Sequence, residues 1–193
     1  MAELKPLNHT GTVRLETERL VLRPTSVFDA EQIYNNWASD PEVTKYLTWQ
    51  PHADVEVTKS ILASWDKENE RLDYYHWGME LKETGEIIGT TGTLGIDEKN
   101  QCTELGYCMS RTYWGKGYMT EAVAAIIEYL FEVVGLNRIT SRHDPDNVGS
   151  GRVMQKNGMI FEGIQRQAYY CERRGFYDLV SYAILREDFK IID

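Results

Sequence analysis

The sequence predicts one α/β domain in which a mixed, mostly antiparallel sheet carries helices on its faces. Two patterns support this prediction. Between residues 75 and 109, three segments alternate large apolar residues with others and are separated by short turns, as consecutive antiparallel strands do. After residue 117, an amphipathic stripe leads into a further strand, which is typical of a crossover to a parallel strand. The 193 residues are enough for a single core.

The first half predicts a strand, two long helices and a short helix between them, after a polar lead-in at residues 1–16. The apolar segment 19–23 is the strand. Ser26 and Asp29 have the spacing of a capping box, which marks a helix start. Helical intervals assign four residues to the apolar face of that helix: Phe28, Ile33, Tyr34 and Trp37. The short helix is expected over 43–47. The second long helix is expected over 54–71, with an apolar face of Val57, Ile61 and Trp65.

The second half predicts three strands, a helix, a strand, a second helix and a final hairpin. The expected ranges are 75–81, 87–94, 102–109, 119–134, 138–142, 148–157, 159–170 and 175–185. Gly135 ends the first of these helices as a C-terminal cap. Because strand 138–142 follows a helix, it is expected to lie parallel to strand 102–109, as the one parallel pair in the sheet. The order β-α-α-β-β-β-α-β-α-β-β occupies residues 1–193 as one domain.

Charge restricts the classes of partner. The net charge is −9, but residues 1–100 carry −8 while residues 101–175 carry +1. Extended nucleic-acid binding needs a basic footprint, so the sequence argues against it. The acidic half either attracts a cationic partner by long-range steering or simply keeps the protein in solution.

Location and metal content follow from what the chain lacks. No apolar run approaches the roughly 18 residues of a membrane span, and residues 1–11 lack the apolar core of a signal peptide. We therefore expect a cytoplasmic protein without a membrane partner. The cysteines Cys102, Cys108 and Cys171 are too scattered for a disulfide framework. The four histidines show no metal-ligand spacing, so no metal is expected.

The segment 111–122 holds the strongest local signal. Gly115 and Gly117 flank Lys116 immediately before the amphipathic helix, and the strand ending at residue 109 precedes them. In a strand, glycine turn and helix start, backbone N–H groups and the positive end of the helix dipole point at one place. Glycine permits positive φ and a close approach of phosphate to the backbone. The segment therefore predicts a phosphate site.

Two common phosphate ligands are excluded by the residues. A dinucleotide loop needs G-x-G-x-x-G after the first strand and an acidic residue about 20 positions later. Here the third glycine is missing, the loop follows the fourth strand, and Asn137 stands where the acid belongs. The P-loop sequence G-x-x-x-x-G-K-[ST] is absent from the chain.

The order of elements and several motifs resemble the GNAT superfamily of N-acetyltransferases. The family's pyrophosphate loop, Q/R-x-x-G-x-G/A, is similar to residues 112–117, with Thr112 in place of Gln or Arg. Arg111, one place earlier, is a candidate for the missing side-chain contact. The sequence of the loop resembles that of the ribosomal-protein N-terminal alanine acetyltransferases, one branch of the family. That branch's N-x-x-S-x-x-V-x-x-K-x-G-F is similar to residues 147–159, with Met159 in place of Phe. Segments 17–23 and 176–182 resemble its opening and last strands, so the likeness covers about residues 15–187.

This resemblance implies acetyl-CoA as the donor co-substrate. The backbone of Tyr107, Cys108 and Met109 is expected to pair with the pantetheine arm, and an N–H there to polarise the thioester carbonyl. The pyrophosphate is expected on Gly115, Lys116, Gly117, Tyr118, Met119 and Thr120. Asn147 is expected to hydrogen-bond to CoA. Gly149 and Gly151, each costing a helix about 1 kcal/mol against Ala, predict a frayed first turn in the helix beside the thiol.

Two residues are candidates for proton transfer. By strand alternation Glu104 shares a face with Gly106 and Cys108, close to the expected thioester, so it is the candidate base, directly or through a water. The alternative is an ion-paired strand carboxylate. Ser150 is the candidate proton donor to the departing thiolate, while the alternative is that Ser150 and Asn147 only cap the last helix.

Other residues have weaker signals. Cys108 as an acyl-accepting nucleophile has no base near it in sequence, and a core cysteine is the alternative. Four tyrosines are expected to pack the last hairpin, or one of them to donate the proton instead of Ser150: Tyr169, Tyr170, Tyr177 and Tyr182. Tyr46 and Trp49 are expected either to line the acceptor groove or to belong to the core.

The resemblance therefore implies direct transfer of acetyl from acetyl-CoA to a primary amine, with the N-terminal α-amine of a protein such as a ribosomal protein as the preferred acceptor. A small cationic amine, such as a polyamine or aminoglycoside, is the nearest alternative. A non-catalytic acyl-CoA-binding module is the alternative from another class. The oligomeric state stays open, a homodimer included.

Overall fold

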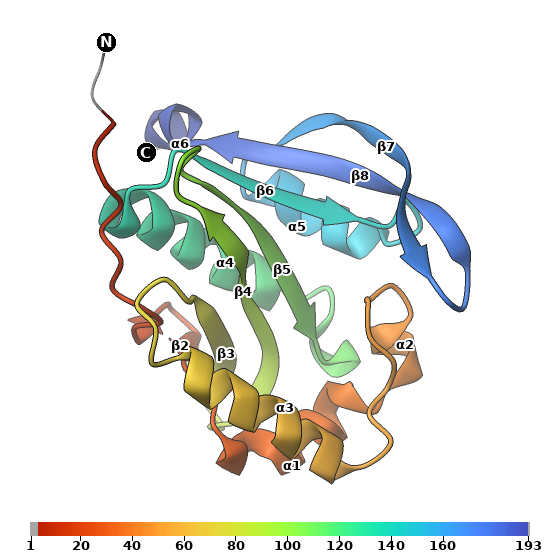
Figure 1. The fold of residues 1–193 in the computed structure, drawn as a ribbon. Helices are drawn as coiled ribbons and strands as arrows, with labels where there is room; N and C mark the ends of the chain where they lie inside the picture. The colour runs from red at the N-terminus through yellow and green to blue at the C-terminus, as the bar shows by residue number, and fades with distance from the viewer. Residues whose placement is uncertain (1–3, 193) are drawn as a thin grey trace.

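A computed structural model describes residues 4–192, with side chains through Phe189, and it has the mixed α/β fold. One eight-stranded sheet has the order β1-β2-β3-β4-β5-β6-β8-β7 (Figure 1). The strands are β1 (Leu15–Glu16), β2 (Leu20–Arg23), β3 (His76–Leu81), β4 (Ile87–Asp97), β5 (Cys102–Met109), β6 (Arg138–His143), β7 (Ile160–Cys171) and β8 (Gly175–Leu185). All neighbouring strands are antiparallel except β5 and β6. The predicted parallel pair is thus confirmed.

The helical segments agree with the predicted order, and one follows the last strand. They are η1 (Val27–Asp29), α1 (Ala30–Ile33), η2 (Tyr34–Ala38), α2 (Pro41–Thr44), α3 (Val55–Glu68), η3 (Arg111–Tyr113), α4 (Tyr118–Tyr129), η4 (Leu130–Val134), α5 (Val148–Lys156) and α6 (Arg186–Ile192). Asp54 caps α3 by accepting hydrogen bonds from the backbone N–H groups of Glu56 and Val57. Gly135 adopts φ 93° after η4, as a C-terminal cap requires. None of the helices in residues 4–192 combines the length and apolar character needed to cross a membrane.

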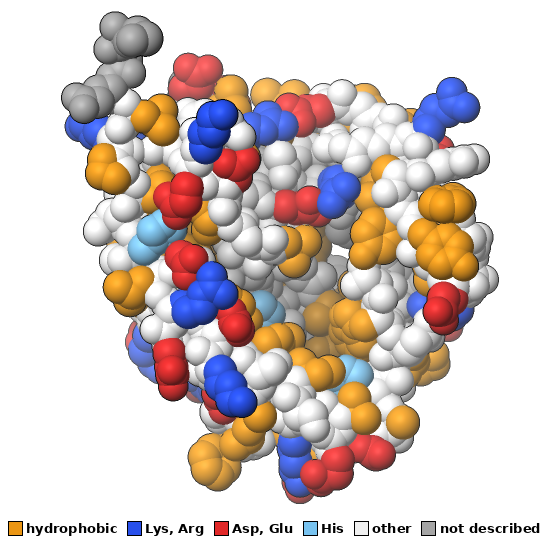
Figure 2. Space-filling model, in the orientation of Figure 1, with side chains coloured by type: hydrophobic (Ala, Val, Ile, Leu, Met, Phe, Trp, Pro, Cys, Tyr) orange, Lys and Arg blue, Asp and Glu red, His pale blue; other side chains and the backbone are white. Residues whose placement is uncertain are grey.

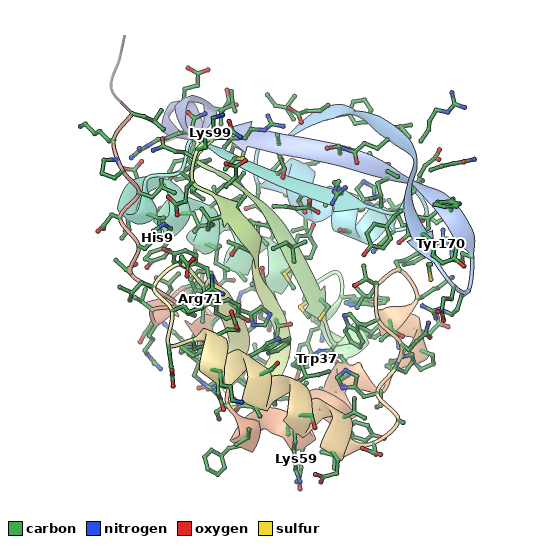
Figure 3. The ribbon with its side chains drawn as sticks, in the orientation of Figure 1. His9, Trp37, Lys59, Arg71, Lys99 and Tyr170 are labelled. Atoms are coloured by element: carbon green, nitrogen blue, oxygen red, sulfur yellow. The ribbon has the colours of Figure 1, made fainter. Side chains whose placement is uncertain are left out.

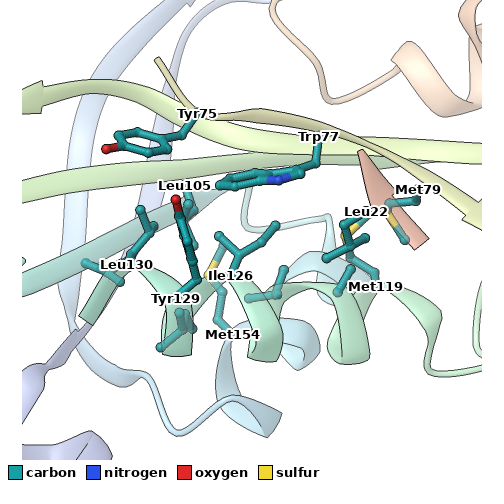
Figure 4. Packing of buried hydrophobic residues seen from close by; sticks show 14 of the residues in the cluster. Leu22, Tyr75, Trp77, Met79, Leu105, Met119, Ile126, Tyr129, Leu130 and Met154 are labelled. Atoms are coloured by element: carbon teal, nitrogen blue, oxygen red, sulfur yellow. The ribbon is translucent and has the colours of Figure 1, made fainter. Parts of the chain in front are cut away.

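The sheet separates two hydrophobic cores. On one face, β2, β3, β5 and β6 pack against α4 and α5 (Figure 1). Trp77 of β3 and Tyr129 of α4 meet edge to face with ring centroids 5.9 Å apart, and Trp77 lies above Ile126, which stands beside Tyr129 on α4 (Figure 4). On the other face, a smaller core joins the α1–η2 segment and α3 to the sheet through residues such as Trp37. Residues of this second core, among them Trp37, also line a cavity that is described below.

Four details differ from the sequence prediction. The strand β1 was not predicted because two residues are too few to show an alternating pattern. The helix α6 was not predicted because its sequence contains no residue pattern that marks the end of a helix. Phe28 is 92% exposed because η1 is a 3-10 turn, which rotates it off the predicted face. On α3 the fully buried residues are Thr58 and Leu62, so Val57 faces outward.

The parallel contact between β5 and β6 is short. Its register pairs run only from Cys102 to Glu104. Beyond that point β5 stays paired with β4 as far as Met109, while β6 stays paired with β8 as far as His143. The two strands therefore diverge and leave a wedge between two halves of the sheet (Figure 1).

The close pairing of β3 with β4 requires glycine at position 92. A Cβ added to Gly92 would lie 2.5 Å from the carbonyl oxygen of Tyr75 and 2.9 Å from the Cα of His76. Its cross-strand partner Gly106 is less constrained, since a Cβ there would meet only the end of the Leu94 side chain at 3.4 Å. Backbone atoms cannot yield as a flexible side chain can.

We expect Gly92→Ala to lower the free energy of unfolding by about 1–3 kcal/mol, because the new methyl group overlaps backbone atoms. Gly106→Ala is the matched control in the opposite strand, and its effect should be clearly smaller. Urea unfolding followed by circular dichroism measures both values. Equal stabilities for the two variants would show that the β3–β4 contact is not tight.

Candidate active site

The glycine loop before α4 offers a set of free backbone donors. Gly115 and Gly117 adopt φ 75° and 84°, which L side chains rarely adopt. Gly117 is the N-cap of α4 and has no side chain to satisfy the first turn. The first helical hydrogen bond is donated by Glu121 to the Gly117 carbonyl. The N–H groups of the preceding three residues therefore lack helical acceptors and point at one place, where the helix dipole also favours an anion.

Arg19 and Glu121 fix the position of this loop. Arg19 Nε donates to Glu121 Oε2 at 2.6 Å, and Arg19 Nη1 donates to the Lys116 carbonyl at 3.0 Å. The Arg19 guanidinium also lies 4.3 Å from the Tyr118 ring centroid. Burial opposes ionisation of Glu121, but hydrogen bonds from Thr17 and Arg19 outweigh it and lower its pKa. The charged carboxylate therefore joins β2 to the first turn of α4.

The wedge exposes one edge of β5. The carbonyls of Thr103 and Leu105 accept hydrogen bonds from the β6 side chains Thr140 and Ser141, at 3.1 and 2.9 Å. By strand alternation the backbone groups of Tyr107 and Met109 point to this same edge, beyond the reach of β6. An extended ligand arm can add there as a further strand.

A cavity of about 590 Å³ lies where β5, β6 and β8 face the α1–α3 segment, and Figure 2 shows the hollow that it forms, with hydrophobic side chains along its walls. It brings together the sequence-predicted residues Glu104, Tyr107, Cys108, Asn147 and Ser150. The predicted loop residues 115–120 and Met109 do not line this cavity. The loop and the cavity thus form two parts of one candidate site.

Glu104 lines the cavity and forms an ion pair, which was the alternative to a role as the base. Arg142 of β6 binds it with both branches, Nε to Oε1 at 3.0 Å and Nη2 to Oε2 at 2.7 Å. Arg142 Nη1 also donates to Gln165 of β7 at 3.2 Å. Each carboxylate oxygen has a second lone pair, so this bidentate pair orients Glu104 and leaves it able to accept another hydrogen bond.

Ser150 and Tyr107 form a hydroxyl pair across the wedge. Ser150 Oγ donates to the Tyr107 hydroxyl at 3.1 Å, and that hydroxyl donates to the Ser150 carbonyl at 3.0 Å. Burial raises the pKa of Tyr107 to about 12, so the phenol keeps its proton near neutral pH. Asn147 caps α5, since its side chain accepts a hydrogen bond from the Ser150 N–H at 3.3 Å. Its capping alternative is therefore present in the structure.

The expectation of a frayed turn at Gly151 is wrong. Helix α5 is regular from Val148, and a Cβ on Gly151 would lie 2.7 Å from Nε2 of His143. His143 Nδ1 contacts the Asp144 carbonyl at 2.8 Å, and its ring stacks on Tyr182. Glycine at 151 thus allows the imidazole to lie against the helix.

Several weaker expectations also find their places. Burial raises the pKa of the Cys108 thiol, and Thr90 lies 3.5 Å from its sulfur, which favours a packed cysteine over a nucleophile. Arg111 pairs with Asp40 at 3.3 Å. Of the four hairpin tyrosines, Tyr169 and Tyr177 line the cavity and Tyr182 is buried. Tyr170 is exposed at the hairpin and is labelled in Figure 3. Within residues 4–192, no three His, Cys, Asp or Glu side chains gather as metal ligands would.

Sequence reasoning missed the residues that act through long-range contacts. Arg19, Glu121, Arg142 and Arg174 each bind a partner far away in the chain or across the cavity. The motif at residues 17–23 was the one available signal for Arg19. The other three residues belong to no recognisable local pattern, because a charged side chain in a sequence is most simply interpreted as solvent-exposed.

Comparisons with known proteins agree with this geometry. A family model described as an acetyltransferase (GNAT) domain matches residues 19–160. An uncharacterized N-acetyltransferase of Bacillus licheniformis is 34% identical over 175 residues, which cover 91% of this chain and 97% of that protein. The ribosomal protein uS5-alanine N-acetyltransferase of Escherichia coli is 27% identical, with 78% and 80% covered.

Solved structures confirm the fold. The crystal structure of an acetyltransferase (GNAT family) from Bacillus anthracis has a TM-score of 0.80 and 27% sequence identity, and the match covers 91% of this chain and 99% of that one. The family model spans most of the sheet and both helices beside the wedge. The chain therefore belongs to the GNAT family of acetyl-CoA-dependent N-acetyltransferases.

Proposed function

We propose that this acetyltransferase transfers the acetyl group of acetyl-CoA to the N-terminal α-amine of a protein or peptide. The observation that carries the proposal is the meeting, in one cavity, of the free β5 edge, the Ser150–Tyr107 hydroxyl pair and the Glu104 carboxylate. Acetyl-CoA supplies a thioester, whose acetyl group is transferred and whose thiol leaves.

The residues present fit the cofactor. The free N–H groups at the start of α4 suit its pyrophosphate, so Gly115, Lys116, Gly117, Tyr118, Met119 and Thr120 would hold it. The edge of β5 at Tyr107 lies beyond the last β6 pair and suits the amide groups of the pantetheine arm, with Cys108 next to it; at Met109 the carbonyl already accepts a hydrogen bond from Trp114 Nε1 at 2.8 Å, so its N–H is the group offered to the ligand. Asn147 lies at the cavity end of α5, where it would contact CoA in addition to capping the helix.

Protein groups then divide the work of the reaction. A backbone N–H at the β5 edge polarises the carbonyl that is attacked. Glu104, oriented by Arg142, accepts the proton of the acceptor ammonium directly or through a water. Ser150 Oγ donates a proton to the leaving sulfur, and its contact with the Tyr107 hydroxyl orients it.

An α-amine suits this set of residues better than a side-chain amine. Deprotonating a lysine, with a pKa near 10.4, costs about 3.5 kcal/mol more than deprotonating an α-amine near 7.8. A carboxylate is a modest general base compared with an amine, which matches the easier task. The E. coli relative, named as a ribosomal protein uS5-alanine N-acetyltransferase, supports a protein acceptor. Cytoplasmic location, the lack of a metal and a possible homodimer stay predictions.

A cofactor assay combined with an amine screen tests the function. Micromolar acetyl-CoA should raise the melting temperature, because it binds the folded state. Peptides with free α-amines should release free thiol, whereas the same peptides blocked at the N-terminus should not. Absence of a thermal shift would remove the cofactor assignment. Cofactor binding with turnover on lysine or polyamine acceptors alone would remove the α-amine.

Glu104→Gln should lower kcat by about 100-fold, as expected for loss of a general base. Arg142→Lys is the control, because it weakens the ion pair while keeping the carboxylate, and it should retain most of the turnover. The measurement is thiol release at saturating acetyl-CoA and peptide. Similar losses in both variants would mean that the ion pair, and not proton transfer, is what the reaction requires.

Ser150→Ala should lower kcat by about 10- to 100-fold and leave the Kd for acetyl-CoA nearly unchanged, because a proton donor is lost and the backbone contacts stay. Ser150→Thr retains a hydroxyl and should recover part of the rate. Calorimetric titration gives the Kd, and single-turnover kinetics gives the rate of transfer. Full activity in the alanine variant would reduce Ser150 to a helix-start residue.

A further inference from the structure

The cavity has two chemically different ends. Glu104, Tyr107 and Ser150 lie at the end between β5 and α5. The other end lies against the α1–α3 segment and contains mostly rings and aliphatic side chains, among them Trp37, Tyr46, Trp49, Ile61 and Trp65. Figure 3 shows Trp37 between α3 and the strands β4 and β5. This second end, which we name the aromatic end, has no part in the proton transfers proposed above.

The two histidines of the aromatic end are uncharged near neutral pH. Burial lowers the pKa of His76 to about 4, and its ring packs on Trp65 with centroids 4.1 Å apart. Nδ1 of His76 is buried and has no hydrogen-bond partner within the described residues. Burial also lowers the pKa of His52, whose Nδ1 lies 2.8 Å from Thr58 Oγ1. Neither ring brings a charge to the cavity.

The carboxylates that line the cavity already have cationic partners. Glu104 is bound by Arg142, and Asp144 lies 2.6 Å from Nη2 of Arg174. Glu104 lies at the other end of the cavity, and the charge of Asp144 is balanced by Arg174, which lies beside Tyr46. A second or third ammonium group of a polyamine would therefore lose its water there without gaining a counter-charge.

The hairpin between β7 and β8 closes this end. Arg173 donates to the Thr44 carbonyl at 3.1 Å, and the Arg174 guanidinium lies 4.7 Å from the Tyr177 ring centroid and 5.9 Å from that of Tyr46. These contacts join the hairpin tip to the loop after α2. The walls are therefore held in position before a ligand enters, which reduces the ordering cost of binding.

We propose that the acceptor is a primary amine that carries an uncharged aromatic group close to the amine, and that the aromatic end receives this group. This inference rests on the proposed function, because it takes the amine to lie beside Glu104. The chemistry is shared by two sources, an N-terminal Phe, Tyr or Trp of a peptide and a free arylalkylamine. In either case the ring leaves water and packs edge to face or offset against Trp49 and Trp65.

Four acceptors test the proposal: 2-phenylethylamine, a peptide with N-terminal Phe, the same peptide with N-terminal Ala, and spermidine. We expect kcat/KM for the Phe peptide to exceed that for the Ala peptide by at least about tenfold, since discrimination by apolar pockets is of this order. Spermidine should be the poorest acceptor. If 2-phenylethylamine is better than the Phe peptide the source is a free amine, and the reverse order indicates a peptide.

Trp49→Leu should reduce the Phe-to-Ala ratio of kcat/KM to about threefold or less, because it removes ring contact at a half-buried loop position. Phe28→Leu makes the same kind of change at a side chain that is 92% exposed and should keep the ratio. Trp65→Leu repeats the test on α3 if the loop variant is unstable.

Equal kcat/KM values for the Phe and Ala peptides, or a preference for spermidine, would overturn the aromatic acceptor while acetyl transfer stands. An unchanged ratio in both tryptophan variants would also overturn it. If none of the four amines is acetylated although acetyl-CoA raises the melting temperature, the proposed function itself fails, and the inference fails with it.

Discussion

The parallel contact between β5 and β6 ends at Glu104, and the rest of the site depends on that position. Each strand keeps its own antiparallel partner, so neither can bend back to close the gap. Backbone N–H and C=O groups that lose a strand neighbour must find another partner when buried. At Leu105 the partner is the Ser141 hydroxyl, and at Met109 the carbonyl accepts from the Trp114 indole; the edge between them, at Tyr107, faces the wedge. Under the proposed function, the wedge serves as a binding surface because the sheet is left incomplete there.

Polar contacts from distant segments hold the wedge in a fixed shape. Arg19 and Glu121 join the turn before β2 to the start of α4, while Tyr107 and Ser150 join β5 to α5 beside the wedge. Arg142 crosses from β6 to β5 at the narrow end. The two arginine–glutamate contacts are charge-assisted hydrogen bonds, and the Tyr107–Ser150 contact joins two neutral hydroxyl groups. Together they position the backbone donors before any ligand arrives.

Most of the fold could be predicted from the sequence, and part of the site could not. Strand alternation placed Glu104, Gly106 and Cys108 on one wall, and the glycine pattern located the free donors at the start of α4. Local patterns cannot report a partner 100 residues away, so Glu121 and its bond to Arg19 were missed. Helix α3 shows the same limit: Ile61 and Trp65 face the cavity as predicted, but Val57 is exposed and Thr58, which hydrogen-bonds His52, is buried in its place.

The hairpin contact from Arg173 to Thr44 also has an evolutionary consequence. The walls around the aromatic end come in part from a loop and a hairpin tip, whereas the proposed donor-binding backbone comes from β5 and α4. Insertions and substitutions are tolerated best in such surface segments. Copies of a gene for this chain can therefore acquire new acceptors by changing residues 44–52 and 171–177 while the register of the sheet is preserved. Acceptor choice and donor binding are free to diverge at different rates.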